Sequence, residues 1–137
     1  MDHETQRLLD AAGRLIDHAL RSGADAADAA VVRSRSRGAS VRLGKVEDTE
    51  SAESEDVSLR VFVGRRVATV SADIRADIGP LVERAVAMAK VSPEDPYAGL
   101  APEDRLLRGD TPFLDSDDQG DPAPAALRAG RSAWCGP

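Results

Sequence analysis

Apolar residues near the N-terminus recur with the spacing of one face of an α-helix. Steps of three and four residues place side chains on the same side of a helix that has 3.6 residues per turn. The pattern ends at Ser22-Gly23, where glycine can adopt the left-handed conformation that terminates a helix. The sequence therefore predicts an amphipathic helix with a buried stripe of Leu8, Leu9, Ala12, Leu15, Ile16, Ala19 and Leu20.

After this helix the apolar period changes to two, which is typical of a strand with one buried face. Residues 26–37 predict a first strand with a cationic far end, and residues 40–43 predict a second, short one. A turn at Gly44-Lys45 leads into the polar, Glu-rich segment 46–54. That segment suits an edge strand, because charges on an edge discourage pairing with other chains.

The clearest strand covers residues 57–63, where branched apolar side chains occupy every second position. A turn at Gly64-Arg65-Arg66 returns the chain into residues 67–70, so the two segments predict a β-hairpin. The strand segments together predict a meander of four or five strands.

A second helix is expected to follow either Asp73 or Asp77 and to stop near Lys90. Asp73 or Asp77 can accept hydrogen bonds as its N-cap. If Asp77 is the cap, Pro80 falls in the first turn, where proline is tolerated. The predicted buried stripe consists of Ile78, Leu81, Val82, Ala85, Met88 and Ala89.

These elements predict an α+β fold, in which an antiparallel sheet of four to five strands carries two helices on one face. The opposite face would hold serines, arginines and Phe62, so we expect a larger assembly to cover it. We expect the domain to span residues 4–107. Residues 108–137 are expected to form a disordered, divergent or truncated tail, because proline, glycine and aspartate replace the apolar periodicity there.

Composition narrows the classes of function. The formal net charge of −6 argues against a nucleic-acid partner, which would need a broad surface that neutralises phosphates. No apolar run approaches the roughly 20 residues of a membrane span, and the N-terminus lacks the pattern of a signal peptide. The single cysteine, Cys135, cannot form an internal disulfide, which agrees with a reducing compartment. A cytoplasmic location and no membrane partner are therefore expected.

Histidine content argues against a metal site within the chain. A catalytic zinc ion needs three protein ligands, and the only histidines are His3 and His18. On one continuous helix the two would lie about 22 Å apart, at 1.5 Å per residue. We therefore expect no catalytic and no metal-binding residue in this chain.

A row of arginines is the most distinctive polar feature of the predicted sheet. Period two places Arg33, Arg35 and Arg37 on one strand face, where guanidinium groups can bind carboxylates. The row and Phe62 are therefore candidate contacts for a partner or a peptide. Alternatively, the arginines pair with glutamates on the neighbouring strand, for which Glu47, Glu50, Glu53 and Glu55 are available.

Three segments, in this order and spacing, resemble the TldD/PmbA family. They are residues 22–31 with the following Arg35–Glu47 region, the hairpin of residues 59–71, and residues 85–100 with their Ser-Pro-Glu-Asp-Pro-Tyr signature. The last segment is more similar to PmbA (TldE) than to TldD. The sequence departs from the family at residues 54–58, where relatives have a glycine-rich segment, and the resemblance fades beyond Asp110.

The resemblance implies a cytosolic setting in proteolysis. In this family two paralogues pair into a zinc metalloprotease that processes peptides and has been named a modulator of DNA gyrase. The TldD-like subunit supplies the zinc through a histidine-glutamate helix motif far downstream, so no catalytic residue, metal ligand or cofactor carries over to this chain. The implied partners are a TldD-like subunit, the chain's own missing C-terminal domain and the peptide substrate of the full complex.

Two hypotheses follow for function. The first is a non-catalytic N-terminal domain of a PmbA-like subunit, or a truncated or frame-shifted product of such a gene. The second is a stand-alone cytosolic binding module that uses the exposed sheet face and the arginine row. A downstream reading frame with family character would favour the first, whereas an unrelated gene would favour the second.

Overall fold

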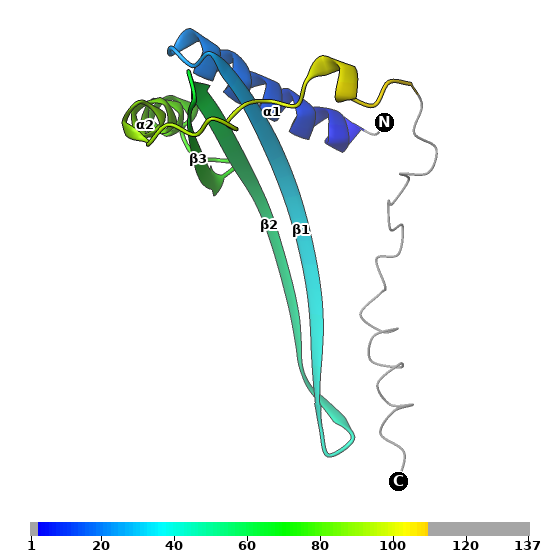
Figure 1. The fold of residues 1–137 in the computed structure, drawn as a ribbon. Helices are drawn as coiled ribbons and strands as arrows, with labels where there is room; N and C mark the ends of the chain where they lie inside the picture. The colour runs from blue at the N-terminus through cyan, green and yellow to red at the C-terminus, as the bar shows by residue number, and fades with distance from the viewer. Residues whose placement is uncertain (1–2, 110–137) are drawn as a thin grey trace. The chain divides into compact units, whose positions relative to one another are not determined.

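The computed structural model describes residues 3–109, which follow the order helix, three strands, helix and a short 3-10 turn (Figure 1). The predicted tail lies, apart from its first two residues, outside the described residues. The elements are α1 (His3–Arg21), β1 (Ala26–Arg42), β2 (Lys45–Val63), β3 (Arg66–Asp73), α2 (Ile78–Val91) and η1 (Glu103–Arg105). The described residues divide into two compact units, of which the first contains residues 3–33 and 54–106 and the second contains residues 34–53 and 107–109.

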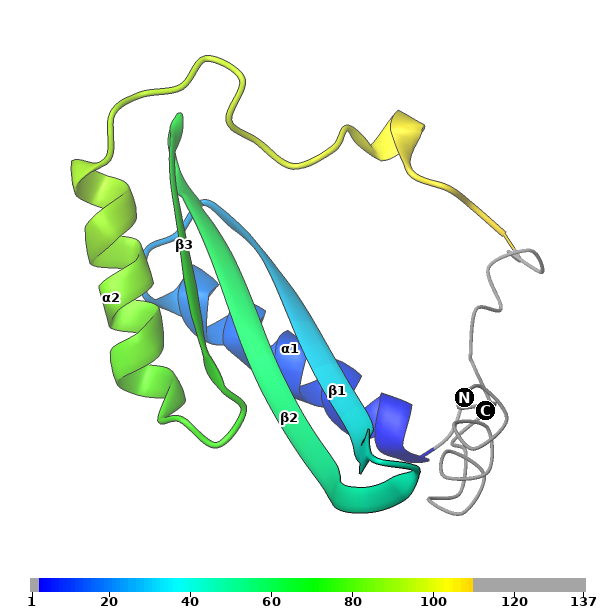
Figure 2. The same ribbon diagram turned by 90° about the horizontal axis from the view of Figure 1, so that it is seen from below.

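The first unit contains the hydrophobic core of the domain. The strands lie in the order β1-β2-β3, and β2 pairs with β3 in antiparallel register, with Leu59 opposite Val70. Both helices pack on one face of this part of the sheet, and α2 lies along β3 and contacts α1 (Figure 2). The core is formed mainly by Leu15, Ala19, Val57, Leu59, Val61, Val70, Val82, Ala85 and Ala89. The predicted α+β fold with two helices on one sheet face is confirmed.

The C-terminus of α1 and the N-terminus of α2 are capped by residues that the sequence offers for these roles. At the C-terminus of α1, Gly23 has a φ of 100°, and the Ala24 N–H donates back to the Ala19 carbonyl at 3.1 Å. This is the glycine-terminated arrangement that satisfies the last carbonyls of a helix. At the start of α2, Asp77 is the N-cap and its carboxylate accepts from the Gly79 N–H at 3.1 Å. Asp77 rather than Asp73 therefore caps the second helix.

The buried stripes differ from the predicted ones at a few positions. Leu9 and Leu20 of α1 and Met88 of α2 are 51%, 46% and 44% exposed, whereas Ala11 and Val86 are buried. Each exposed residue lies at the margin of an apolar stripe. A residue there is buried only if the sheet extends beneath it, and the hydrophobic pattern of the helix does not determine how far the sheet extends. The predicted stripes are therefore correct in direction, but they include some exposed residues and miss Ala11 and Val86.

The sheet has three long strands rather than four or five short ones. Gly38 does not interrupt β1, because its φ is not positive and a side chain there would meet only Glu50 Cβ, at 3.9 Å. The polar segment 46–54 likewise continues into residues 57–63 as one strand, β2. The predicted breaks at Gly38 and near Ser54 are therefore wrong, and four of the predicted strands merge into two.

The second unit contains the hairpin of residues 34–53, whose side chains are almost all exposed. Its turn consists of Leu43 and Gly44, with φ values of 51° and 76°. Positive φ at both central residues is the geometry of a type I′ turn, in which asparagine followed by glycine is favoured. Leu43 is 94% exposed, so no packing offsets the unfavourable backbone conformation of this branched residue.

We expect the Leu43→Asn variant to have a more stable hairpin tip. Asparagine tolerates the left-handed conformation, so the local gain should be about 1 kcal/mol. Hydrogen exchange at the amides around residues 40–47 should slow by about fivefold, since 1.4 kcal/mol corresponds to a factor of ten. The Gly44→Ala variant, which adds a side chain at a φ of 76°, should exchange faster than the wild type. Unchanged exchange in Leu43→Asn would contradict this account.

Candidate functional site

The first arginine of the predicted row is bound by carboxylates within the first unit. Arg33 forms an ion pair with Glu4 of α1, and its Nε lies 3.7 Å from Glu55 Oε1. Glu55 also accepts from Arg7 Nη2 at 2.6 Å. These four residues form one charge network in which two guanidinium groups are balanced by two carboxylates, so its net charge is zero.

The other two arginines of the row lie in the second unit. Arg35 Nε is 2.9 Å from Glu53 Oε1, and Arg37 is also engaged in an interaction. Nearer the tip, Arg42 Nη1 lies 3.7 Å from Glu47 Oε1. The structure thus supports the alternative in which glutamates on the neighbouring strand pair with the arginines. A role of the row in contacting a partner or peptide stays a prediction.

Phe62 lies on the sheet face opposite the helices, as its place between Val61 and Val63 predicts, but it is only 4% exposed. The Arg60 guanidinium carbon lies 5.3 Å from the centroid of its ring, a distance typical of a cation–π contact. Hydrogen bonds to Asp28 hold Arg60 there and raise the pKa of its guanidinium. Phe62 is therefore largely covered in this structure, and its role in contacting a partner or peptide stays a prediction.

The chain after α2 returns to the β2–β3 turn and fixes it. The Asp95 N–H donates to the Arg65 carbonyl at 2.8 Å, and Arg66 donates to the Ser92 carbonyl. On the other side of the turn, Asp25 Oδ2 accepts from the Gly64 N–H at 2.6 Å. The Asp25 N–H also donates to the Phe62 carbonyl at 2.8 Å, so the start of β1 and the end of β2 are joined at this edge.

The described residues do not fit the zinc ion that the family implies. Within residues 3–109, no three His, Cys, Asp or Glu side chains come together in a group that could hold a metal ion. A catalytic zinc site requires three protein ligands, so no reaction step can be assigned to zinc within this part of the chain.

Across the same residues, no helix has both the length and the apolar character needed to cross a membrane.

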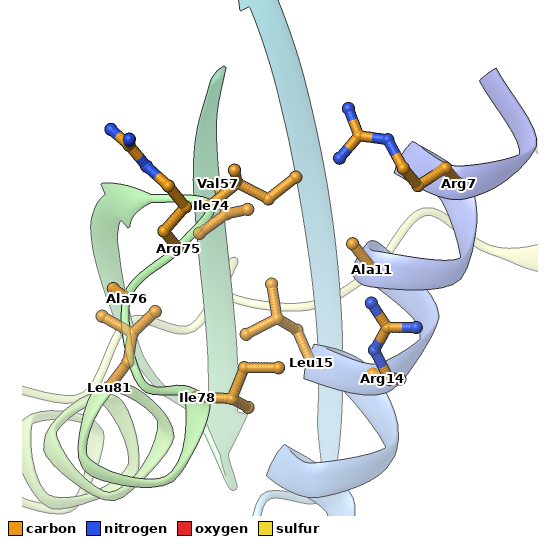
Figure 3. Close-up of a pocket in the computed structure, with 10 residues that line it drawn as sticks. All are labelled: Arg7, Ala11, Arg14, Leu15, Val57, Ile74, Arg75, Ala76, Ile78 and Leu81. Atoms are coloured by element: carbon orange, nitrogen blue, oxygen red, sulfur yellow. The ribbon is translucent and has the colours of Figure 1, made fainter. Parts of the chain in front are cut away.

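A pocket of about 260 Å³ opens in the first unit between α1, the end of β3 and the start of α2. Figure 3 shows its apolar side chains converging from these elements, with Arg7 and Arg14 on the α1 side and Arg75 on the opposite side. The larger apolar side chains that line it are Leu15, Val57, Ile74, Ile78 and Leu81. Arginines are the only charged residues of the lining, so the rim is cationic and the floor is hydrophobic.

The three arginines of the pocket differ in their partners. Arg7 is bound by Glu55, and Arg75 binds both carboxylate oxygens of Asp73 at 2.8 Å. Arg14, by contrast, has no hydrogen bond or ion pair with any of the residues that the structure describes. The net positive charge of the pocket is therefore that of Arg14.

The Arg75 contacts have a consequence for acid titration. Side-chain hydrogen bonds from Arg75, together with its backbone N–H at 2.8 Å, hold the pKa of the Asp73 carboxyl well below its usual range. The same contacts raise the pKa of Arg75. A depressed folded-state pKa stabilises the fold above the ordinary aspartate pKa of about 3.9, and this stabilisation is lost as the pH falls.

We expect the Arg75→Gln variant to shift the Asp73 pKa upward, toward the ordinary value. Part of the depression should remain, because the backbone N–H of residue 75 still donates to Asp73. Carboxyl carbon NMR across an acid titration would measure the shift directly. The Arg84→Gln variant, which changes an exposed arginine of α2, should leave the titration of Asp73 as it is in the wild type. Equal curves for Arg75→Gln and the wild type would refute the assignment.

The arginines of this pocket were not predicted as a site from the sequence. Arg7 and Arg14 are seven residues apart on one helix, so two turns of α1 place them along the same side. That spacing was visible in the sequence. The third arginine, Arg75, comes from the loop after β3, and only the tertiary fold brings it to the opposite rim.

A family model and two solved structures are similar to this chain, and their descriptions point to the same family. Residues 27–89 match the family model described as PmbA/TldA metallopeptidase domain 1. No curated protein matches the chain. The described fold is also similar to two solved structures.

One is a crystal structure named as a modulator of DNA gyrase from Bacteroides thetaiotaomicron, with a TM-score of 0.69 and 21% identity over 81% of this chain. The other is TldE from Thermococcus kodakarensis, with a TM-score of 0.60 and 25% identity over 74% of this chain. The matches cover 25% and 23% of those chains, so this chain spans about a quarter of the length of both.

The matched segment begins at the second residue of β1 and ends within the last turn of α2, so it includes nearly all of the sheet and most of the second helix. The solved relatives share the fold over a wider stretch, because their coverage exceeds that of the family model. Over residues 27–89 the chain is therefore similar to the first, metallopeptidase-related domain of the PmbA/TldA family, and its described residues share the fold of TldE.

Proposed function

We propose that this chain acts as the non-catalytic N-terminal domain of a PmbA/TldE-like subunit in a zinc-dependent peptidase complex. The observation that carries the proposal is the match of residues 27–89 to the first domain of the family, in a segment that offers no three grouped metal ligands. In this proposal, zinc and the hydrolytic chemistry belong to a TldD-like partner. The chain contributes to proteolysis by shaping the complex, in the cytoplasm.

The architecture of the first unit supports a role in assembly. Both helices pack on one face of the sheet, while the other face exposes Ala30, Val32, Thr69 and Ser71. Such a mixed surface suits coverage by a neighbouring domain. The proposed neighbours are a TldD-like subunit and a C-terminal domain of the kind that relatives of about four times this length would contain.

The first test separates this chain from a peptidase in its own right. The purified chain is expected to bind no stoichiometric zinc and to cleave no peptide, because His3 and His18 are too far apart on α1 to share an ion. Metal analysis and a peptide-cleavage assay would measure both properties. One tightly bound zinc ion per chain, lost on substitution of either histidine, would overturn the proposal.

The second test addresses the proposed partner. A TldD-like protein from the same organism should form a complex with this chain that elutes together in size-exclusion chromatography. Zinc and peptidase activity should then follow the TldD-like protein. If the two proteins elute separately at every concentration tried, the proposed assembly is wrong.

A further inference from the structure

We propose that the pocket between α1 and the β3–α2 connection is a binding site for a carboxylate attached to an aliphatic group. The C-terminal residue of a peptide and a free branched-chain carboxylic acid share this chemistry. The proposal uses only residues of the first unit and does not depend on a catalytic partner.

The charge of the pocket favours an anionic ligand. Arg14 lies at the rim with no hydrogen bond or ion pair to any other described residue, although most arginines around it are paired. Asp10, one turn earlier on α1, accepts instead from Gln6 Nε2 at 2.9 Å. A guanidinium group binds a carboxylate through two parallel hydrogen bonds, so Arg14 offers a complete docking group for one anion.

The number of unpaired cations selects the type of anion. Arg7 and Arg75 already neutralise Glu55 and Asp73, so the pocket carries a single net positive charge. A monoanion matches that charge. A phosphate group, with up to two negative charges at neutral pH, would exceed it.

The hydrophobic floor defines the rest of the ligand. Leu15, Ile74 and Ile78 converge beneath the rim (Figure 3), and none of the residues of the lining is acidic. The volume of about 260 Å³ lies just below the range of ~300–1,000 Å³ that is typical of sites for drug-sized molecules. The pocket therefore suits one aliphatic side chain with its adjoining carboxylate.

The experiment is an NMR titration of the full 137-residue chain with 4-methylpentanoate and, separately, with its neutral amide. We expect saturable shifts at the amides of Ala11, Ala76 and Ile78 with the acid, at a Kd on the order of 1 mM for so small a ligand. The amide should bind at least tenfold more weakly, because it lacks the charge that pairs with Arg14.

Variants assign the effect to Arg14. Arg14→Gln should raise the Kd for the acid about tenfold, Arg14→Lys should keep most of the affinity, and Arg21→Gln should match the wild type. Arg21 is the matched control, because it is an exposed arginine of the same helix outside the pocket. Arg14 itself is exposed, and circular dichroism of each variant would verify that it is folded.

Two further ligands distinguish the sources of the carboxylate. The peptide Ala-Ala-Leu with a free C-terminus is compared with the same peptide amidated at the C-terminus. Tighter binding of the free peptide than of 4-methylpentanoate identifies a peptide terminus as the ligand, and the reverse order identifies a free acid. Equal binding of acid and amide, no binding of either acid, or an Arg14→Gln variant with wild-type affinity would each overturn the proposal.

Discussion

Replacing Leu59 by alanine is expected to destabilise the first unit by about 3 kcal/mol, the middle of the range for a buried leucine. Leu59 is 0% exposed and lies in the C-terminal part of β2, where it packs in the core and pairs with Val70 of β3. Alanine would remove three carbon atoms and leave a cavity in a close-packed interior. Urea denaturation followed by circular dichroism would measure the loss.

The effect should be large relative to the stability of the whole domain. The free energy of unfolding of a small domain is about 5–15 kcal/mol. Only 3% of the residues of this chain are aromatic, so few bulky side chains contribute to the core. Leu9→Ala is the matched control, because Leu9 is 51% exposed on α1. It should change the unfolding free energy by less than about 1 kcal/mol. Similar losses in the two variants would show that the core is not centred on β2.

Enlarging Ala89 to leucine is the second substitution with a large expected effect. Ala89 is 0% exposed in the last turns of α2, where the helix packs closely on the core. A leucine there would force side chains from their preferred rotamers or push the helix outward, at a cost of about 1–3 kcal/mol. Thermal unfolding would show a lower midpoint.

The control for this variant lies two residues away. Ala87 is exposed on the same helix, and leucine is nearly as good a helix former as alanine, so Ala87→Leu should unfold at about the wild-type midpoint. A large drop in Ala87→Leu, or none in Ala89→Leu, would mean that the face of α2 that packs on the sheet has been assigned incorrectly.

Local signals in the sequence predicted the helices well. The glycine at position 23, the cap at Asp77 and the apolar spacing of three and four residues act within a few residues of one another. Sequence periodicity also predicted which residues of β2 face the helices, because alternation along a strand is a property of the backbone itself.

The number of strands depended on contacts that are distant in sequence. The local sequence at Gly38 and in the acidic segment near Ser54 is typical of the end of a strand. Because β1 and β2 pair with each other, both strands nevertheless continue past these positions. Cross-strand partners such as Arg35 and Glu53 stabilise such polar segments as strand. Tertiary pairing therefore overrode the local signals.

The candidate site was predicted least well. The sequence placed Phe62 on the correct face but could not show that Arg60 lies against its ring or that its main-chain carbonyl joins Asp25. The pocket around Arg14 depends on the loop after β3, whose approach to α1 is set by the packing of both helices. Pockets assembled from three separate elements leave no single periodic pattern in a sequence.

The alternation along β2 limits how this domain can change in length. Val57, Leu59 and Val61 face the helices, whereas Ser58 and Arg60 face away, and the register with β3 fixes this choice. One residue inserted just before Val57 would leave residues 57–63 in register with β3 but shift them by one step against β1. If β2 kept its register with β1 instead, polar side chains would turn toward the core. At the tip, by contrast, one extra residue on each side of Leu43-Gly44 lengthens the hairpin without moving any core residue. Insertions and deletions among homologous sequences should therefore gather at this tip in matched pairs, while the segment from Glu55 to Val63 keeps a constant length.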